Sequence, residues 1–104
     1  MNAVKVQYTV KDEYVEINKK NIVQVMRALK EINSPDIKYS AFLLDDGKTF
    51  VHFVMRANEE AGNILSNLEA FKDFQQQLRN SEPESPPQAE NLTWVGISWD
   101  IFKV

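Results

Sequence analysis

His52 is the only histidine in this chain, and it is the side chain best suited to acid–base chemistry near neutral pH. The sequence has no cysteine, which excludes disulfides, thiolate nucleophiles and cysteine-ligated metals. A multi-histidine metal site is also excluded within one chain, and no acidic calcium-binding loop occurs, so we expect no metal. His52 is therefore either a general base or a hydrogen-bonded residue within a dimer interface.

Three aromatic residues, Tyr8, Tyr39 and Trp99, are predicted to lie between a β-sheet and its helices. An aromatic-lined space with phenolic hydroxyls suits a small planar ligand, and the flexible side chains of Met26 and Met55 would let it adapt. The same residues also fit ordinary core packing, in which each polar tip finds a hydrogen-bond partner. The turn at Asp46-Gly47 lacks a phosphate-binding glycine pattern, so we expect no nucleotide cofactor.

The balance of charged residues indicates which classes of binding partner to expect. Twelve basic and fifteen acidic residues give a net charge of −3, which argues against a nucleic-acid or anionic-membrane partner, because both require a concentrated positive patch. No apolar run reaches the roughly 18 residues of a membrane span, and the first residues lack a basic-then-apolar signal pattern. We expect a cytoplasmic protein.

The hydrophobic periodicity predicts the elements that position these residues. Period-two alternation indicates strands, and apolar residues at helical spacing indicate helices. Asp-Gly between two strand patterns predicts a tight hairpin, and the proline-rich segment 80–91 predicts a loop. The expected elements are a strand at 3–10, a helix at 12–32, strands at 37–44 and 49–55, a helical region at 58–78 with a break near 67, and a last strand at 92–102.

This order of elements is the split βαβ pattern of ferredoxin-like folds, β-α-β-β-α-β. We predict one α+β domain over residues 1–104, with a four-stranded antiparallel sheet in the order 4-1-3-2. Right-handed crossovers place both helices on one face of that sheet.

Strand parity divides the sheet into two faces. In the third strand, Val51, Phe53 and Met55 form the uniformly apolar set, so we predict that they face the helices. By the same rule, Val95, Ile97, Trp99 and Ile101 face the helices from the last strand. A one-residue error in register would exchange the two faces of any strand.

The face away from the helices would then be too apolar for solvent. Its large side chains would expose more than the few hundred Å² common on soluble monomers, so a second copy of the chain is the simplest cover. We therefore predict a homodimer formed sheet to sheet. Its predicted interface residues are Phe42, Phe50, His52, Trp94 and Phe102.

The segment F-V-H-F-V-M-R-A-N-E-E-A at 50–61, followed by I-L-S-N-L-E-A-F-K-D-F at 64–74, resembles the third strand and second helical region of antibiotic biosynthesis monooxygenase-like proteins. The resemblance implies a ferredoxin-like chain that dimerises as an α+β barrel. Members often carry an aromatic residue where this chain has Arg56, and histidines where it has Leu65 and Ala70. The residues most associated with that family's chemistry are therefore not matched.

Three functions follow as hypotheses. The first is a dimer that binds a small apolar or aromatic molecule without catalysis. The second, implied by the resemblance, is a cofactor-independent monooxygenase acting on an aromatic substrate, with His52 or Tyr8 as base. The third is a structural or assembly dimer that holds no ligand.

Overall fold

Four strands and three helices make up the computed structural model, which describes residues 1–98 and 100–102. Trp99 therefore lies outside the described residues, and its predicted place in the pocket stays a prediction. The elements are β1 (Asn2–Thr9), a 3-10 turn (Asp12–Tyr14), α1 (Val15–Ile32), β2 (Ile37–Leu43), β3 (Thr49–Arg56), α2 (Glu59–Ser66), α3 (Glu69–Asn80) and β4 (Ser85–Leu92).

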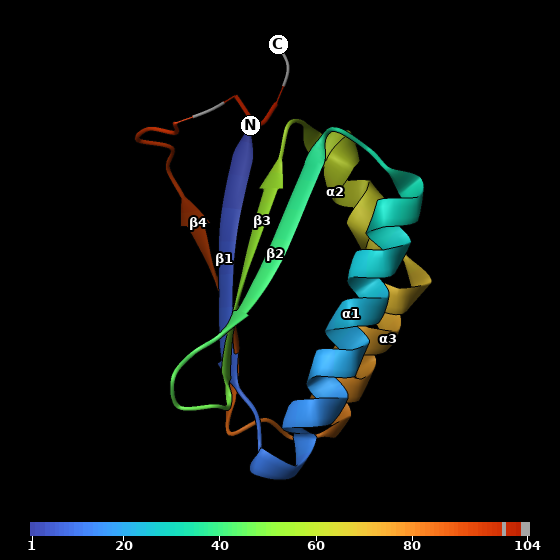
Figure 1. The fold of residues 1–104 in the computed structure, drawn as a ribbon, viewed down its shortest axis with the longest axis vertical. Helices are drawn as coiled ribbons and strands as arrows, with labels where there is room; N and C mark the ends of the chain where they lie inside the picture. Colours follow the sequence, from blue (N-terminus) through green and yellow to red (C-terminus); the bar gives the residue numbers. More distant parts are fainter. Residues whose placement is uncertain (99, 103–104) are drawn as a thin grey trace.

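The strands form one antiparallel sheet in the order β2-β3-β1-β4, which is the predicted order read from its other edge. The helices lie together on one side of this sheet (Figure 1). The predicted break in the second helical region is confirmed, because α2 ends at Ser66 and α3 begins at Glu69. The α+β ferredoxin-like fold is thus confirmed.

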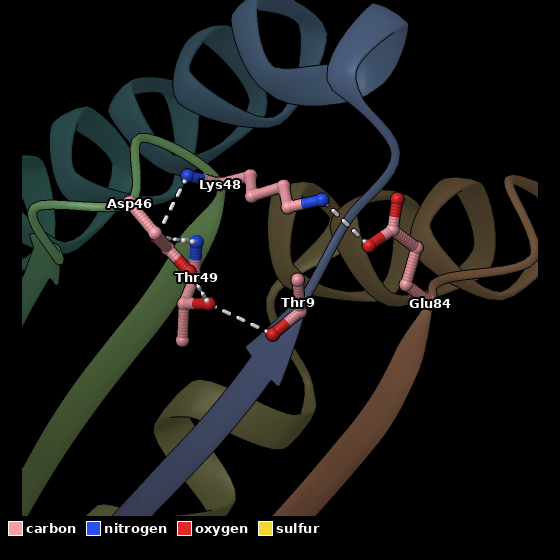
Figure 2. A network of polar contacts seen from close by, with 5 residues as sticks. All are labelled: Thr9, Asp46, Lys48, Thr49 and Glu84. Atoms are coloured by element: carbon pink, nitrogen blue, oxygen red, sulfur yellow. Dashed lines mark hydrogen bonds and ion pairs between the residues drawn. The ribbon is translucent and has the colours of Figure 1, made fainter.

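The β2–β3 hairpin turns where Asp-Gly predicted it. Gly47 has a φ of +76°, which side-chain-bearing residues rarely adopt. Asp46 accepts hydrogen bonds from the backbone N–H groups of Lys48 and Thr49, at 3.0 and 2.8 Å, and from the Thr49 hydroxyl. Thr49 also contacts Thr9 of β1, with 2.8 Å between the hydroxyl oxygens (Figure 2). The hairpin is thereby tied to the end of β1.

The last strand does not lie where the sequence predicted it. The predicted loop at 80–91 contains β4, whereas Thr93–Ser98 forms no strand. The segment is predicted to be a loop because it contains Pro86 and Pro87, and proline lacks the N–H group that a regular strand ladder uses. Both are tolerated here because β4 is an edge strand and its pairing with β1 is irregular between Gln7 and Thr9.

The predicted facing of β3 is also wrong. Val6 of β1 and Ala41 of β2 pair directly with His52, and directly paired residues point to the same side of a sheet. Phe50, His52 and Val54 therefore face the helices, with 2%, 2% and 8% of their surfaces exposed. The uniformly apolar set, including Met55, faces away. The prediction failed because it treated a histidine as unsuited to the core.

These corrections change the predicted dimer interface. Phe50 and His52 belong to the helix-facing layer, and Phe102 is only 7% exposed within the single chain. Trp94 is partly buried, so only Phe42, at 54% exposed, remains a large exposed aromatic on the outer face. Val95 is fully exposed and Ile97 is 44% exposed. The prediction that they pack under the helices is therefore wrong.

Candidate functional site

Three strands bring the only histidine between two tyrosines. The Tyr8 hydroxyl lies 2.8 Å from His52 Nε2, and the Tyr39 hydroxyl lies 2.6 Å from His52 Nδ1. Strand register explains this convergence. Tyr8 pairs with Phe50 and Tyr39 pairs with Val54, so each tyrosine is diagonal to His52, from opposite sides. Both ring nitrogens of the imidazole are therefore satisfied although the side chain is buried.

A fourth residue completes this cluster from the helix layer. Asn18 of α1 is fully buried and donates its side-chain N–H to the Tyr8 oxygen at 2.8 Å. Sequence reasoning did not select Asn18. The available signal was its place three residues after Val15 and four before Ile22, on the apolar side of the helix. A polar residue at such a position indicates a buried hydrogen bond.

The cluster borders a pocket of about 310 Å³ between the sheet and α3. That volume is at the lower end of the range for small-molecule sites, roughly 300–1,000 Å³. The ring of Phe71 meets Tyr39 edge to face at 6.3 Å, and Phe74 lies 5.6 Å from His52 between centroids. The lining residues are Val6, Tyr8, Tyr39, His52, Val54, Phe71, Phe74, Gln75, Leu78, Arg79 and Pro87.

Burial sets the protonation states in this pocket. It lowers the pKa of His52 to about 4, so the imidazole is neutral at pH 7. Burial raises the pKa of Tyr8 and of Tyr39 well above the usual phenol value. The cluster is therefore a neutral network, and neither tyrosine is available as a phenolate base.

Other concavities are larger, and neither of the two largest holds this cluster. A groove of about 490 Å³ lies between the end of α1 and β2, and a polar one of about 580 Å³ lies beside Arg56 and α2. Among the pockets of the described residues, the 310 Å³ pocket brings Tyr8, Tyr39 and His52, whose pKa values burial shifts strongly, together on one aromatic wall. That combination marks it as the candidate site.

The residues predicted to form one pocket lie in different places in the structure. Tyr8 and Tyr39 line the pocket together with His52, which the sequence had placed on the other face. Met26 lines the 490 Å³ groove instead, and Met55 faces away from the helices because its set in β3 does. The sequence did not single out Arg79 or Phe74, which α3 supplies.

Residues 1–98 and 100–102 contain neither a cluster of metal ligands nor a membrane-spanning helix. No group of three potential metal ligands lies together there. Within that same part of the chain, no helix combines the length and apolar character needed to cross a bilayer.

Comparison with known proteins supports the fold. No protein-family model and no curated protein matches the sequence. Among solved structures, an antibiotic biosynthesis monooxygenase shares 17% identity over 92% of this chain and 100% of its own, with a TM-score of 0.76. This chain has the antibiotic biosynthesis monooxygenase-like fold. The resemblance noted in the sequence is confirmed at that level.

Proteins with this monooxygenase-like fold differ in what is known of them. SnoaB, a cofactor-independent oxygenase from Streptomyces nogalater, shares 11% identity over 95% of this chain and 97% of its own, with a TM-score of 0.70. NE2512, a protein of unknown function from Nitrosomonas europaea, shares 14% identity over 95% of this chain and 93% of its own, with a TM-score of 0.74. Identities this low carry the fold and not the activity.

Proposed function

We propose that this protein binds a small, largely apolar aromatic molecule in the pocket between the sheet and α3. The observation that carries the proposal is the Tyr8–His52–Tyr39 cluster on the wall of an aromatic-lined pocket. Apolar walls with a few convergent polar groups are the usual composition of small-molecule sites. The pocket also argues against a purely structural role.

Binding without catalysis is the simpler reading of the cluster. An imidazole with a pKa of about 4 is a weak base, and efficient general bases have pKa values near the working pH. The two tyrosines stay protonated near neutrality. The cluster therefore supplies hydrogen bonds to a ligand more readily than it removes a proton from one.

Binding is tested by thermal unfolding of the protein with a panel of neutral naphthalene derivatives. A ligand at 100 times its dissociation constant stabilises the folded state by about 2.7 kcal/mol, which raises Tm by roughly 10 °C or more. Gln75→Trp should abolish the shift, because Gln75 is exposed and lines the pocket. Asp73→Trp is the matched control, since Asp73 is exposed on the same helix and does not line the pocket. No shift with any probe would remove the proposal.

Cofactor-independent oxygenation of an aromatic substrate is the second candidate. It is favoured by the fold shared with SnoaB and by a neutral imidazole, which can accept a proton, in contact with the pocket. The chemistry requires a substrate that loses a proton and then itself reduces oxygen. Substrate-dependent oxygen uptake by the protein, lost in His52→Gln, would support it. Absence of uptake with electron-rich phenols would exclude this candidate.

We also propose a homodimer formed through the sheet face opposite the helices. Phe42 is exposed there and packs edge to face on Phe53, with 6.0 Å between ring centroids. The exposed Val95 and Ile97 alternate with Gly96 and Ser98, a period typical of a strand that gains a partner. A second copy would cover both features at once.

A further inference from the structure

The proton on the His52 ring has two possible positions, and the surrounding hydrogen bonds select one. A neutral imidazole carries one N–H and one bare nitrogen. Both nitrogens face tyrosine hydroxyls, Nε2 facing Tyr8 and Nδ1 facing Tyr39. Each hydroxyl can donate or accept, so the two contacts alone do not fix the tautomer.

Asn18 breaks this symmetry. Its side-chain N–H donates to the Tyr8 oxygen, so that oxygen already accepts one hydrogen bond. If Nε2 also carried the proton, the Tyr8 oxygen would accept twice and its own hydrogen would have no acceptor among the described residues. Tyr8 is only 2% exposed, so an unpaired hydroxyl hydrogen there costs roughly 1–3 kcal/mol.

The opposite tautomer gives both the buried Tyr8 hydroxyl hydrogen and the imidazole N–H an acceptor. Tyr8 then donates to Nε2, and Nδ1–H donates to the Tyr39 oxygen. Reversing the Asn18 amide would invert this order. However, it would bury an unpaired NH₂ group where the carbonyl oxygen now lacks a partner. An unpaired buried donor is rarer in proteins than an under-satisfied carbonyl, so the present orientation is the better one.

We propose that Asn18 is a positioning residue that holds His52 in the Nδ1–H tautomer and so leaves the Tyr39 hydroxyl hydrogen free to bind a ligand. Tyr39 lines the pocket and accepts from Nδ1, which frees its own O–H. Among the described residues of the lining, Arg79 is the only charged one and none carries a carboxylate. The pocket thus offers donors, and the ligand it fits is an aromatic carbonyl or phenolate.

The tautomer is directly measurable because the chain has one histidine. A long-range ¹H–¹⁵N spectrum of the ligand-free protein at pH 7.5 contains a single imidazole. We expect the Nε2 resonance, identified by its couplings to both ring hydrogens, at the position of a bare nitrogen. A protonated Nε2 would overturn the assignment to Asn18 without any variant being needed.

Variants then test whether Asn18 is the cause. Asn18→Leu removes the donor to Tyr8, so the two tautomers become closer in energy and both ¹⁵N shifts should move towards their average. Asn21→Leu is the matched control, since that amide lies on the same helix and contacts Gln77 instead. Unchanged shifts in folded Asn18→Leu would refute a positioning role.

The ligand class rests on the proposed function and is tested separately. The probes are 2-acetylnaphthalene, which only accepts hydrogen bonds, and its hydrocarbon counterpart 2-isopropenylnaphthalene. One net hydrogen bond from Tyr39 predicts about tenfold tighter binding of the ketone, and Tyr39→Phe should remove that preference. Equal binding would refute the ligand class. If neither probe binds while the Nδ1–H tautomer is found, the proposed function fails and the role of Asn18 stands.

Discussion

At the scale of single residues, the site is defined by how a histidine can be buried without charge. His52 is accommodated among aromatic rings because a tyrosine hydroxyl meets each of its nitrogens. The cost of burying a polar ring is thereby offset by hydrogen bonds, as buried polar groups require. This arrangement has consequences for stability at low pH and for each tyrosine separately.

Stability should fall as the solution is acidified from neutrality, because the unfolded chain takes up a proton on His52 before the folded chain does. The stabilisation from the neutral ring is complete above pH ~6.5. It is lost as the pH falls to about 4, the pKa in the folded state. The total is on the order of 3 kcal/mol, at ~1.4 kcal/mol per pKa unit. Urea unfolding between pH 7 and 4 measures it.

His52→Gln is the comparison for this effect, since glutamine can contact both hydroxyls and does not titrate. Its stability profile should be flatter between pH 6.5 and 4. Hydrogen bonds from Thr49 and the backbone hold the pKa of Asp46 below its usual value near 3.8, so that carboxylate titrates at lower pH. Parallel profiles for the two proteins would contradict the assignment to His52.

The two tyrosine hydroxyls should differ in their contribution to stability. Tyr8→Phe leaves both the Nε2 atom and the Asn18 amide without partners in a buried place, and we expect a loss of about 2–3 kcal/mol. Tyr39→Phe leaves only Nδ1 unpaired, beside the pocket, and should cost about 1 kcal/mol. Urea unfolding with matched m-values provides the test, and the reverse order would contradict this picture.

At the scale of elements, the hairpin between β2 and β3 sets the register on which the site depends. A shift of one residue would turn His52 away from both tyrosines. Asp46 and Gly47 fix the turn locally, and the Thr9–Thr49 contact fixes β3 against β1. The turn is therefore as important to the pocket as the residues that line it.

Gly47→Ala should destabilise the protein by about 1–2 kcal/mol, because the φ of +76° is strained for a residue with a Cβ atom. The space around position 47 is open, so the effect is conformational and not steric. Gly96→Ala is the control, since its surroundings are equally open and its backbone is outside the left-handed region. Equal effects in the two variants would show that backbone strain is not the cause.

The sequence predicted local structure better than it predicted facing. The hairpin, the helices and the break near Asn67 follow from turn chemistry and helical periodicity, which act within a few residues. The facing of β3 does not follow from such local signals. A rule based on hydrophobicity alone omits the hydrogen bonds by which Tyr8 and Tyr39 satisfy His52 across the sheet. The strand containing Pro86 and Pro87 was missed for a related reason, since only its edge position tolerates them.

At the scale of the whole molecule, the sheet has one face covered by helices and one that presents Phe42. The sequence overestimated the exposed aromatic surface, because Phe50 is in the core and Phe102 is covered within the single chain. What remains is a smaller apolar area, and it makes the proposed dimer dependent on few side chains.

Phe42→Lys should therefore shift a dimer towards monomer, because it places a charge on the face proposed to pair. Ile17→Lys, at an exposed isoleucine of α1, is the matched control and should leave the mass unchanged. Light scattering over a range of protein concentrations measures both. A wild-type protein that is monomeric at all concentrations would rule out self-association through this face.

The exposure of β4 also makes this strand the part of the sheet most prone to local opening. All eight of its side chains are exposed, so it is held by backbone pairing to β1, by the 3.9 Å Lys5–Glu90 ion pair and by the 2.9 Å Lys48–Glu84 ion pair beside its start (Figure 2). We expect its amide hydrogens to exchange with solvent orders of magnitude faster than those of β1 and β3. Because Pro87 belongs to both β4 and the pocket wall, this local opening would give the proposed ligand a way in while the core stays folded.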